Sequence, residues 1–165
     1  MLEPRRAATM LKKSPDLIRT ISRHTLAYML CSISEIFRYY KDFDPLDLLI
    51  IHAVLNANVI NVMKDAQLDK QFSSVDAVEP DAIKQGVSRS SLSRFLGLPI
   101  ETIRRRVNRL IEIGILSQRS GGLIVSQANA FKFGNNHKLQ TTNVTLVRKL
   151  LRDLSRAGIK GPDDL

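Results

Sequence analysis

Apolar residues recur at helical spacing in the first quarter of the chain. Between Pro15 and about Lys41 they alternate at steps of four and three, which places them on one stripe of a long helix. A helix with such a stripe packs at a shallow angle against a partner helix, so we expect the stripe to contribute to a dimer interface. Its members are Leu26, Leu30, Ile33, Phe37 and Tyr40.

A second helix is predicted to follow at once. Asp44 is a typical N-cap residue, and Pro45 suits the first helical position. The segment from there to about residue 64 is apolar nearly all round, which is typical of a central, buried helix. Residues 65–87 are mixed and polar, and they predict a loop with at most one weak helical turn.

The pattern sharpens at Ser88, a candidate cap for a short helix over residues 89–96. Gly97 ends that helix, because glycine tolerates a positive φ. A longer helix is predicted to follow the short one, over residues 99–113, and it stops at Gly114. On the short helix we expect Leu92, Phe95 and Leu96 to face inward.

Two short apolar-rich segments, residues 115–118 and 123–127, flank a Gly-Gly pair and predict a β-hairpin. Residues 128–140 are polar and rich in Asn, which indicates a connection. A last helix is predicted from Asn143 to Ala157. Its apolar side includes Leu151 and Leu154, which we expect to add to the dimer interface.

The order of these elements predicts a fold class. It is a mainly α fold with a small β-hairpin wing: a winged helix-turn-helix with additional N- and C-terminal helices. Residues 1–43 form a basic arm and a long helix for dimerisation, and residues 44–135 form the DNA-binding domain. Residues 136–165 supply a C-terminal helix for dimerisation or packing.

The net positive charge is confined to the second half of the chain. The formal net charge is +9, and residues 85–165 carry all of it, with fourteen Lys or Arg against five Asp or Glu. Such a distribution indicates a polyanionic partner, usually nucleic acid or an acidic membrane. No apolar run is long enough to cross a membrane, and the one cysteine, Cys31, cannot form an internal disulfide. We therefore expect a cytoplasmic protein without a membrane partner.

The helix predicted over residues 99–113 concentrates this charge on one side. Ile103, Val107 and Leu110 fall on its buried arc, together with Ile100 and Ile111. Arginine can bond a guanine edge with two hydrogen bonds, and glutamate can accept from a cytosine amino group. The expected base-contacting residues are Glu101, Thr102, Arg105 and Arg109. The expected phosphate-contacting residues are Arg89, Ser91, Arg94, Arg104, Arg106, Arg119 and Ser120.

Residues 91–116 resemble the helix-turn-helix of winged bacterial transcription regulators. The stretch Glu-Thr-Ile-Arg-Arg at 101–105 is similar to the start of the recognition helix in the cyclic-AMP receptor family. The closing Leu-Ile-Glu-Ile-Gly-Ile-Leu at 110–116 is similar to MarR-like and GntR-like regulators. The resemblance implies that Glu101 and Arg105 read bases, that Thr102 touches phosphate, and that the wing around residues 119–122 lies along the backbone or in the minor groove.

Two residues depart from this family pattern. Ser93 stands where these motifs usually have Ala, and Arg106 stands where an apolar residue is frequent. Residues 15–64 are predicted to be helical, so the cyclic-nucleotide-binding β-roll is missing and its sensing mechanism is not implied. The flanking helices look more like MarR-type organisation.

No pattern for catalysis, metal binding or a cofactor is found. The sequence has no Cys-x-x-Cys, no His-Glu-x-x-His and no glycine-rich phosphate loop, so we expect no enzyme activity, no metal and no cofactor. A small-molecule effector is left open, because no residue marks its cavity. The expected function is a homodimeric, sequence-specific transcription regulator of double-stranded DNA, with the helix at 99–113 in the major groove and the wing at 116–127 on the backbone or minor groove. The alternative is a winged-helix module for protein–protein assembly, whose basic face meets an acidic partner.

Overall fold

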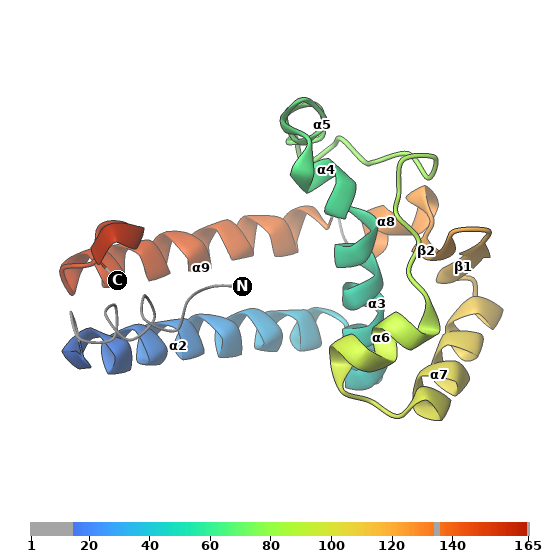
Figure 1. Cartoon of the computed structure of the whole chain (residues 1–165), viewed down its shortest axis with the longest axis horizontal. Helices are drawn as coiled ribbons and strands as arrows, with labels where there is room; N and C mark the ends of the chain where they lie inside the picture. Colours follow the sequence, from blue (N-terminus) through green and yellow to red (C-terminus); the bar gives the residue numbers. More distant parts are fainter. Residues whose placement is uncertain (1–14, 134–135, 165) are drawn as a thin grey trace, which may run out of the picture. The chain divides into compact units, whose positions relative to one another are not determined.

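The structure, a computed structural model, describes residues 15–133 and 136–164. The basic arm expected at residues 1–14 lies outside the described residues. Within them the chain is mainly helical, with one two-stranded antiparallel hairpin. The elements in chain order are α2 (Pro15–Tyr39), α3 (Pro45–Asn58), α4 (Ile60–Lys64), α5 (Ala66–Gln71), α6 (Arg89–Leu96), α7 (Ile100–Glu112), β1 (Leu116–Arg119), β2 (Gly122–Val125), α8 (Gln127–Phe133), α9 (His137–Arg156) and the 3₁₀ turn η1 (Pro162–Asp164) (Figure 1).

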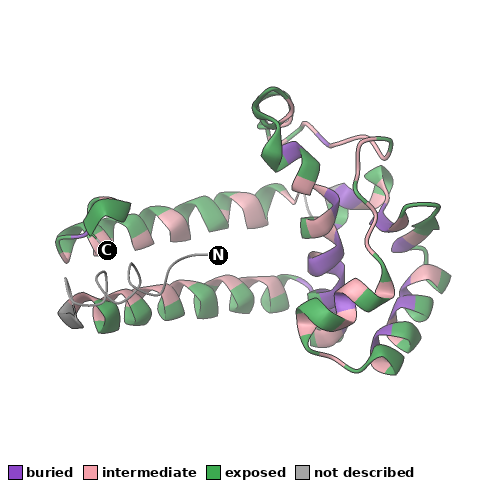
Figure 2. Ribbon diagram, viewed as in Figure 1, coloured by how far each residue is buried: buried purple, intermediate pink, exposed green. Residues whose placement is uncertain are grey.

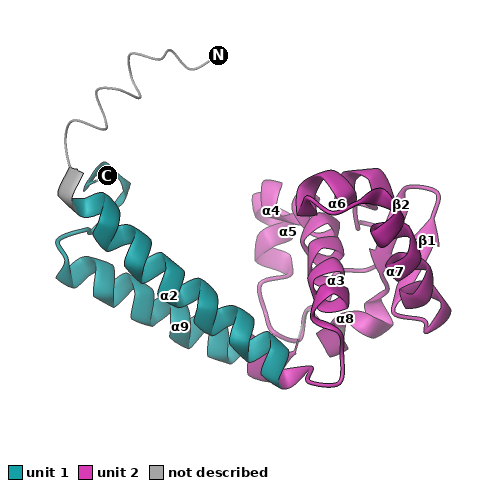
Figure 3. Cartoon of the chain, turned by 90° about the horizontal axis from the view of Figure 1, so that it is seen from below, with its two compact units in different colours: residues 1–38, 141–165 teal, residues 39–140 magenta. Residues whose placement is uncertain are grey.

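The chain divides into two compact units (Figure 3). Unit 1 comprises residues 1–38 and 141–165, and unit 2 comprises residues 39–140. The segment predicted as the DNA-binding domain, residues 44–135, lies wholly within unit 2. Among the described residues, no helix combines the length and the apolar character that a membrane crossing requires.

Unit 1 is built from α2 and α9, which lie side by side and run in opposite directions (Figures 1 and 3). The hydroxyl of Tyr28 donates to Oδ1 of Asn143 at 2.9 Å across the pair. Among the described side chains, neither α2 nor α9 contains a buried residue (Figure 2). Among the described side chains of unit 1, only Ile159, which follows α9, is buried, so the unit has little burial of its own.

Unit 2 is organised around α3, which begins as predicted. The Asp44 side chain accepts a hydrogen bond from the backbone N–H of Leu46 at 2.8 Å, and Pro45 occupies the first turn. The buried residues, purple in Figure 2, lie on α3 itself and on the elements packed around it. It includes Leu48, Ile50, Ile51 and Val54 of α3, Leu92 of α6, Ile103, Val107 and Leu110 of α7, and Leu123, Ile124 and Val125 of β2.

The single helix predicted over residues 44–64 is wrong in its length. α3 ends at Asn58, whose buried side chain binds the backbone of the hairpin region, and α4 restarts at Ile60. Asp65 then caps α5 by accepting from the N–H groups of Gln67 and Leu68. The weak helical turn expected after residue 65 is therefore the short helix α5.

The connection predicted for residues 128–140 is also wrong. Residues 127–133 form α8, and α9 starts at His137, six residues before the predicted start. Ala130 and Phe133 face the core one helical turn apart, with exposed fractions of 3% and 2%. Two buried residues in a polar stretch are too few to show a helical period in the sequence.

Tyr40, predicted to lie in the dimer interface, belongs instead to the core of unit 2. It is 6% exposed, and its ring stacks on that of Phe133 with 5.2 Å between the ring centroids. Its hydroxyl donates to the backbone carbonyls of Lys132 and Phe133. Burial, together with the neighbouring Tyr39, raises the pKa of Tyr40 to about 12. α2 has ended by residue 39, so the predicted stripe does not extend to Tyr40.

Candidate nucleic-acid interface

α6 and the turn after it are held by side-chain caps. Ser88 accepts from the N–H of Ser91 at 3.1 Å, and Gly97 adopts a φ of 65° at the helix end, both as predicted. The Ser93 hydroxyl donates to the carbonyl of Leu98 at 2.6 Å and fixes the turn. This bond gives a reason for serine at the position where the resembling motifs have alanine. Phe95, predicted to face inward, is 72% exposed, so this part of the prediction is wrong.

α7 has one buried side and one exposed side. Ile103, Val107 and Leu110 are fully buried, as the periodicity predicts, whereas Ile100 in the first turn is 37% exposed. The opposite side carries exposed polar residues: Glu101, Arg104, Arg105, Asn108 and Arg109. Thr102, predicted to contact a base, is half-buried. The exposed side is available to a partner because α7 packs in unit 2 through its apolar arc.

Three arginines of this exposed side differ in their pairing. Arg104 is bound to Glu101 at 2.7 Å in an ion pair that is open to solvent. Arg109 lies 3.4 Å from Oδ2 of Asp47 and is 63% exposed. Arg105 is exposed, and no residue in 15–133 or 136–164 forms a hydrogen bond or ion pair with its side chain. Arg105 is therefore the arginine on α7 with the least internal compensation.

Arg106, predicted to contact phosphate, is turned inward, and this prediction is corrected. Its Nη1 lies 2.9 Å from Oδ1 of Asp47 and 2.8 Å from Oδ1 of Asp44, and its side chain is 21% exposed. The hydrogen bond that Arg106 donates to Asp47 is the main cause of the raised pKa of Arg106, and it outweighs partial burial, which acts to lower that pKa. Its Nε is buried without a hydrogen-bond partner among the described residues. Arg106 therefore fastens α7 to the start of α3.

Arg89 links α6, α7 and the hairpin through its guanidinium. Nη1 donates to Oε1 of Gln118 in β1 at 2.8 Å, and Nη2 donates to Oδ1 of Asn108 in α7 at 3.1 Å. The bridge holds the outward amides of a helix and a strand next to each other. Sequence reasoning gave Arg89 a phosphate contact only, because two partners 19 and 29 residues away leave no local pattern.

The hairpin is fastened to the segment that precedes α6. β1 and β2 pair from Leu116↔Val125 to Arg119↔Gly122, and Val87 exchanges backbone hydrogen bonds with Leu123 of β2. The approach is so close that a Cβ built on Gly86 would lie 2.3 Å from the carbonyl oxygen of Gly121. Glycine is therefore required at position 86 because any side chain there would clash with the backbone of Gly121, and not because of its φ angle.

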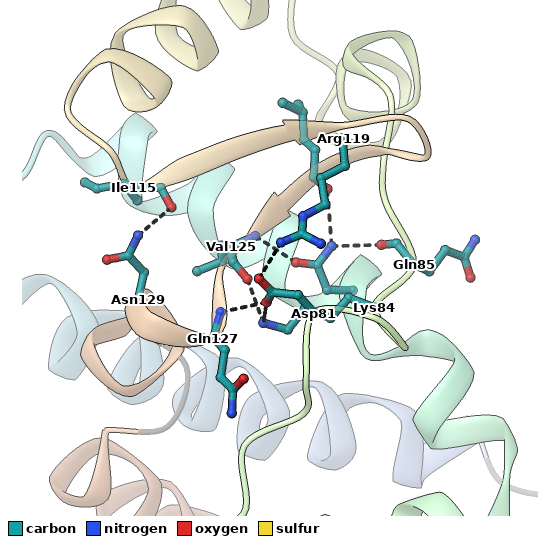
Figure 4. A network of polar contacts seen from close by, with 10 residues as sticks. Asp81, Lys84, Gln85, Ile115, Arg119, Val125, Gln127 and Asn129 are labelled. Carbon is teal, nitrogen blue, oxygen red and sulfur yellow. Dashed lines mark hydrogen bonds and ion pairs between the residues drawn. The ribbon is translucent and has the colours of Figure 1, made fainter.

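Buried polar side chains hold the base of the hairpin (Figure 4). Nζ of Lys84, whose side chain is 2% exposed, donates to Oδ1 of Asp81 at 2.9 Å and to the carbonyl of Val125 at 2.8 Å. Asn58 accepts from the N–H of Val125 at 3.0 Å and donates to the carbonyls of Gln85 and Leu123. Sequence reasoning missed these positioning residues. Asn58 is one of several polar residues in a largely apolar helix, so the sequence does not single it out.

Asp81 reaches the hairpin itself. Its Oδ2 lies 2.8 Å from Nη2 of Arg119, and its Oδ1 accepts from the N–H of Gln127 at 2.7 Å. Burial opposes ionisation, but the hydrogen bond from Lys84 and the other contacts outweigh it and lower the pKa of Asp81. Arg119, predicted to contact phosphate, is thus held by a carboxylate while remaining 52% exposed.

The remaining predicted phosphate-contacting residues lie on the surface of unit 2. Arg94 and Ser120 are exposed, and Ser91 is half-buried beside the cap of α6. Within the described residues, no three His, Cys, Asp or Glu side chains group in a way that could hold a metal ion. Comparison with protein-family models, with curated proteins and with solved structures found no match for the chain.

Proposed function

We propose that the chain is a transcription regulator that binds double-stranded DNA sequence-specifically through a winged helix-turn-helix formed by α3, α6, α7 and the β1–β2 hairpin. The observation that carries the proposal is the exposure of Arg105 on α7. Its exposed guanidinium has no internal partner among the described residues, on a helix whose apolar arc is fully packed. A free guanidinium on a protruding helix can bond a guanine edge in the major groove with two hydrogen bonds.

The neighbours of Arg105 fit the same use. Asn108 and Arg109 lie on the same side of α7, and the Arg104–Glu101 pair is open to solvent and weak, so DNA can replace it. The Arg89 bridge keeps β1 close to this side, which gives the hairpin the role of a wing beside the groove. Arg94, Arg119 and Ser120 are proposed to contact phosphates around it. Such a regulator acts where the chromosome is, in the cytoplasm of a bacterial cell.

The test begins with a binding sequence selected from a random duplex pool. Fluorescence anisotropy on that duplex and on a single-base variant then compares Arg105→Ala with the wild type. Loss of Arg105 is expected to remove about 1–3 kcal/mol of discrimination at one base pair. Arg104→Ala is expected to weaken all sequences alike. Lys64→Ala removes the same charge from an exposed site on α4 and serves as the matched control.

Salt dependence separates DNA binding from the alternative, assembly with an acidic protein. The logarithm of the DNA affinity is expected to fall linearly with the logarithm of the salt concentration, with a slope set by the number of phosphates neutralised. If no sequence is enriched, or if Arg105→Ala and Lys64→Ala bind alike, the proposal fails. An acidic protein partner for the same face then becomes the better hypothesis.

A further inference from the structure

Unit 1 leaves large apolar side chains in solvent along one side of α2. These residues are 40–57% exposed. At 100° per residue they fall within an arc of roughly 120°. They are Ile18, Leu26, Met29, Leu30, Ile33 and Phe37. Two polar residues fall within this arc, Ser22 and, near its N-terminal end, the exposed Arg19, and the arc contains no acidic side chain. From Ser22 to Phe37 the stripe is therefore continuous and without charge.

The stripe is not the side of α2 that faces α9. Tyr28, whose hydroxyl bonds to Asn143 of α9, marks the inner arc, and the half-buried Ile21 and His24 share it. On the same wheel the centre of the exposed stripe is turned by more than 90° from this inner arc. The packing of α2 on α9 thus leaves the stripe uncovered.

α9 repeats the arrangement on a smaller scale. Its half-buried residues, among them Leu146 and Leu150, mark its inner arc. Val144 and Leu151 lie on one flank and are 56% and 61% exposed. Seen from the N-terminus of each helix, the exposed flank is rotated in the same sense from the inner arc. Since the two helices run in opposite directions, both flanks fall on the same side of the pair.

We propose that this side of the α2–α9 pair is covered by the same side of a second copy of the chain, giving a four-helix bundle. The apolar side, hereafter the bundle face, consists of the six α2 residues named above with Val144 and Leu151. Contiguous apolar patches larger than a few hundred Å² are rare on monomers and mark interfaces. Large side chains about half exposed along a 25-residue helix provide a patch of that order, comparable to the ~800 Å² that each partner buries in a stable complex.

Two further observations favour a second copy over another partner. Neither α2 nor α9 has a buried residue among the described side chains, and Ile159 after α9 is the one buried residue described in unit 1, so the pair has almost no core until another layer covers it. The arc of α2 also has no charged residue between Ser22 and Phe37, so this part of two identical faces can meet without burying like charges. A twofold axis brings identical patches together, and the spacing of Leu26, Leu30, Ile33 and Phe37 is that of helix–helix seams.

The inference is independent of DNA binding, and its test needs no DNA. Sedimentation equilibrium of the full chain is expected to give twice the chain mass of 18.6 kDa at micromolar concentrations. Leu26→Glu places a charge in the bundle face and is expected to shift the mass toward the monomer. Ala27→Glu is the matched control, because Ala27 is exposed on the polar side of the same helix turn, and it is expected to remain dimeric.

A cross-linking experiment covers the case in which Leu26→Glu fails to fold. In a Cys31→Ser background, Ile33→Cys is expected to form cross-linked dimers with a short bismaleimide, whereas Ala27→Cys is not. A wild-type monomer at all concentrations overturns the proposal, as does a dimer that Leu26→Glu leaves intact while Ile33→Cys does not cross-link. A monomer that instead sediments with anionic lipid vesicles overturns it too, and assigns the face to a membrane surface.

Discussion

Nη1 of Arg106 lies 2.9 Å from Oδ1 of Asp47, and this ion pair joins the candidate reading helix to the central helix of unit 2. Asp47 is 3% exposed in its side chain, while Arg106 retains 21% exposure and a second carboxylate partner in Asp44. Arg106 lies between the buried arc and the exposed side of α7. Because its ion pairs fix the rotation of α7 about the helix axis, they also fix the direction in which the neighbouring Arg105 points.

Replacing Asp47 by Ala is expected to destabilise the fold. A buried pair that loses one partner leaves an uncompensated charge, and such losses cost about 3–5 kcal/mol. Because Asp44 remains beside Arg106 and the guanidinium is partly solvated, we expect about 2 kcal/mol, read from the urea midpoint. The double variant Asp47→Leu with Arg106→Leu is expected to recover part of the loss. A loss that the double variant leaves fully in place would contradict the ion-pair explanation.

Gly86→Ala is expected to destabilise the hairpin region. The new Cβ would lie 2.3 Å from the carbonyl oxygen of Gly121, and backbone atoms cannot move away cheaply. We expect a cost of about 2 kcal/mol in the free energy of unfolding, in the range of overpacked sites. Gly121→Ala is the matched control, since a Cβ there has no neighbour within 4 Å. Its effect is expected to stay within about 0.5 kcal/mol. Equal losses at both positions would contradict the close-approach argument.

Local signals in the sequence were sufficient for the start of α3 and for the boundaries of α6 and α7. The cap at Asp44, the cap at Ser88 and the left-handed glycines at 97 and 114 lie where predicted, because each depends on residues one to three positions away. The buried arc of α7 was predicted for the same reason: its hydrophobic period is regular over the whole helix.

Long-range partners decided what the sequence could not predict. Arg106 is turned inward by Asp47, 59 residues earlier, and Tyr40 is buried by Phe133, 93 residues later. An arginine on the flank of a helix and a tyrosine at the end of an apolar stripe carry no mark of such partners. The network of Asp81, Lys84 and Asn58 was missed likewise, because it lies in a loop without periodicity and at a helix end.

Acid is expected to weaken the base of the hairpin through Asp81. Its pKa in the fold is below the ordinary 3.8, so folding favours the ionised carboxylate. Its stabilising contribution is complete above the unfolded pKa and is lost as the pH falls through the lower, folded value. The difference in unfolding free energy between the wild type and Asp81→Asn is expected to be constant from pH 5 to 7 and to shrink below about pH 4. Denaturation at a series of pH values measures it. A difference that persisted through the acid range would show that Asp81 acts by shape rather than charge.

His52 is expected to give the fold a second, milder sensitivity at higher pH. Its ring lies against Tyr40, and Nδ1 donates to the carbonyl of Leu48 at 2.8 Å. Burial lowers its pKa below 6.5, although the bond to Leu48 opposes the shift. As the pH falls through about 6.5, His52 therefore takes up a proton in the unfolded chain but remains neutral in the folded chain. The free energy of unfolding decreases as the pH drops below that value. His52→Gln removes this proton uptake. The stability of the wild type relative to His52→Gln is expected to decline steadily from pH 7 to 5. The other histidines cancel in this comparison, so parallel curves for the two proteins would show that His52 titrates alike in both states.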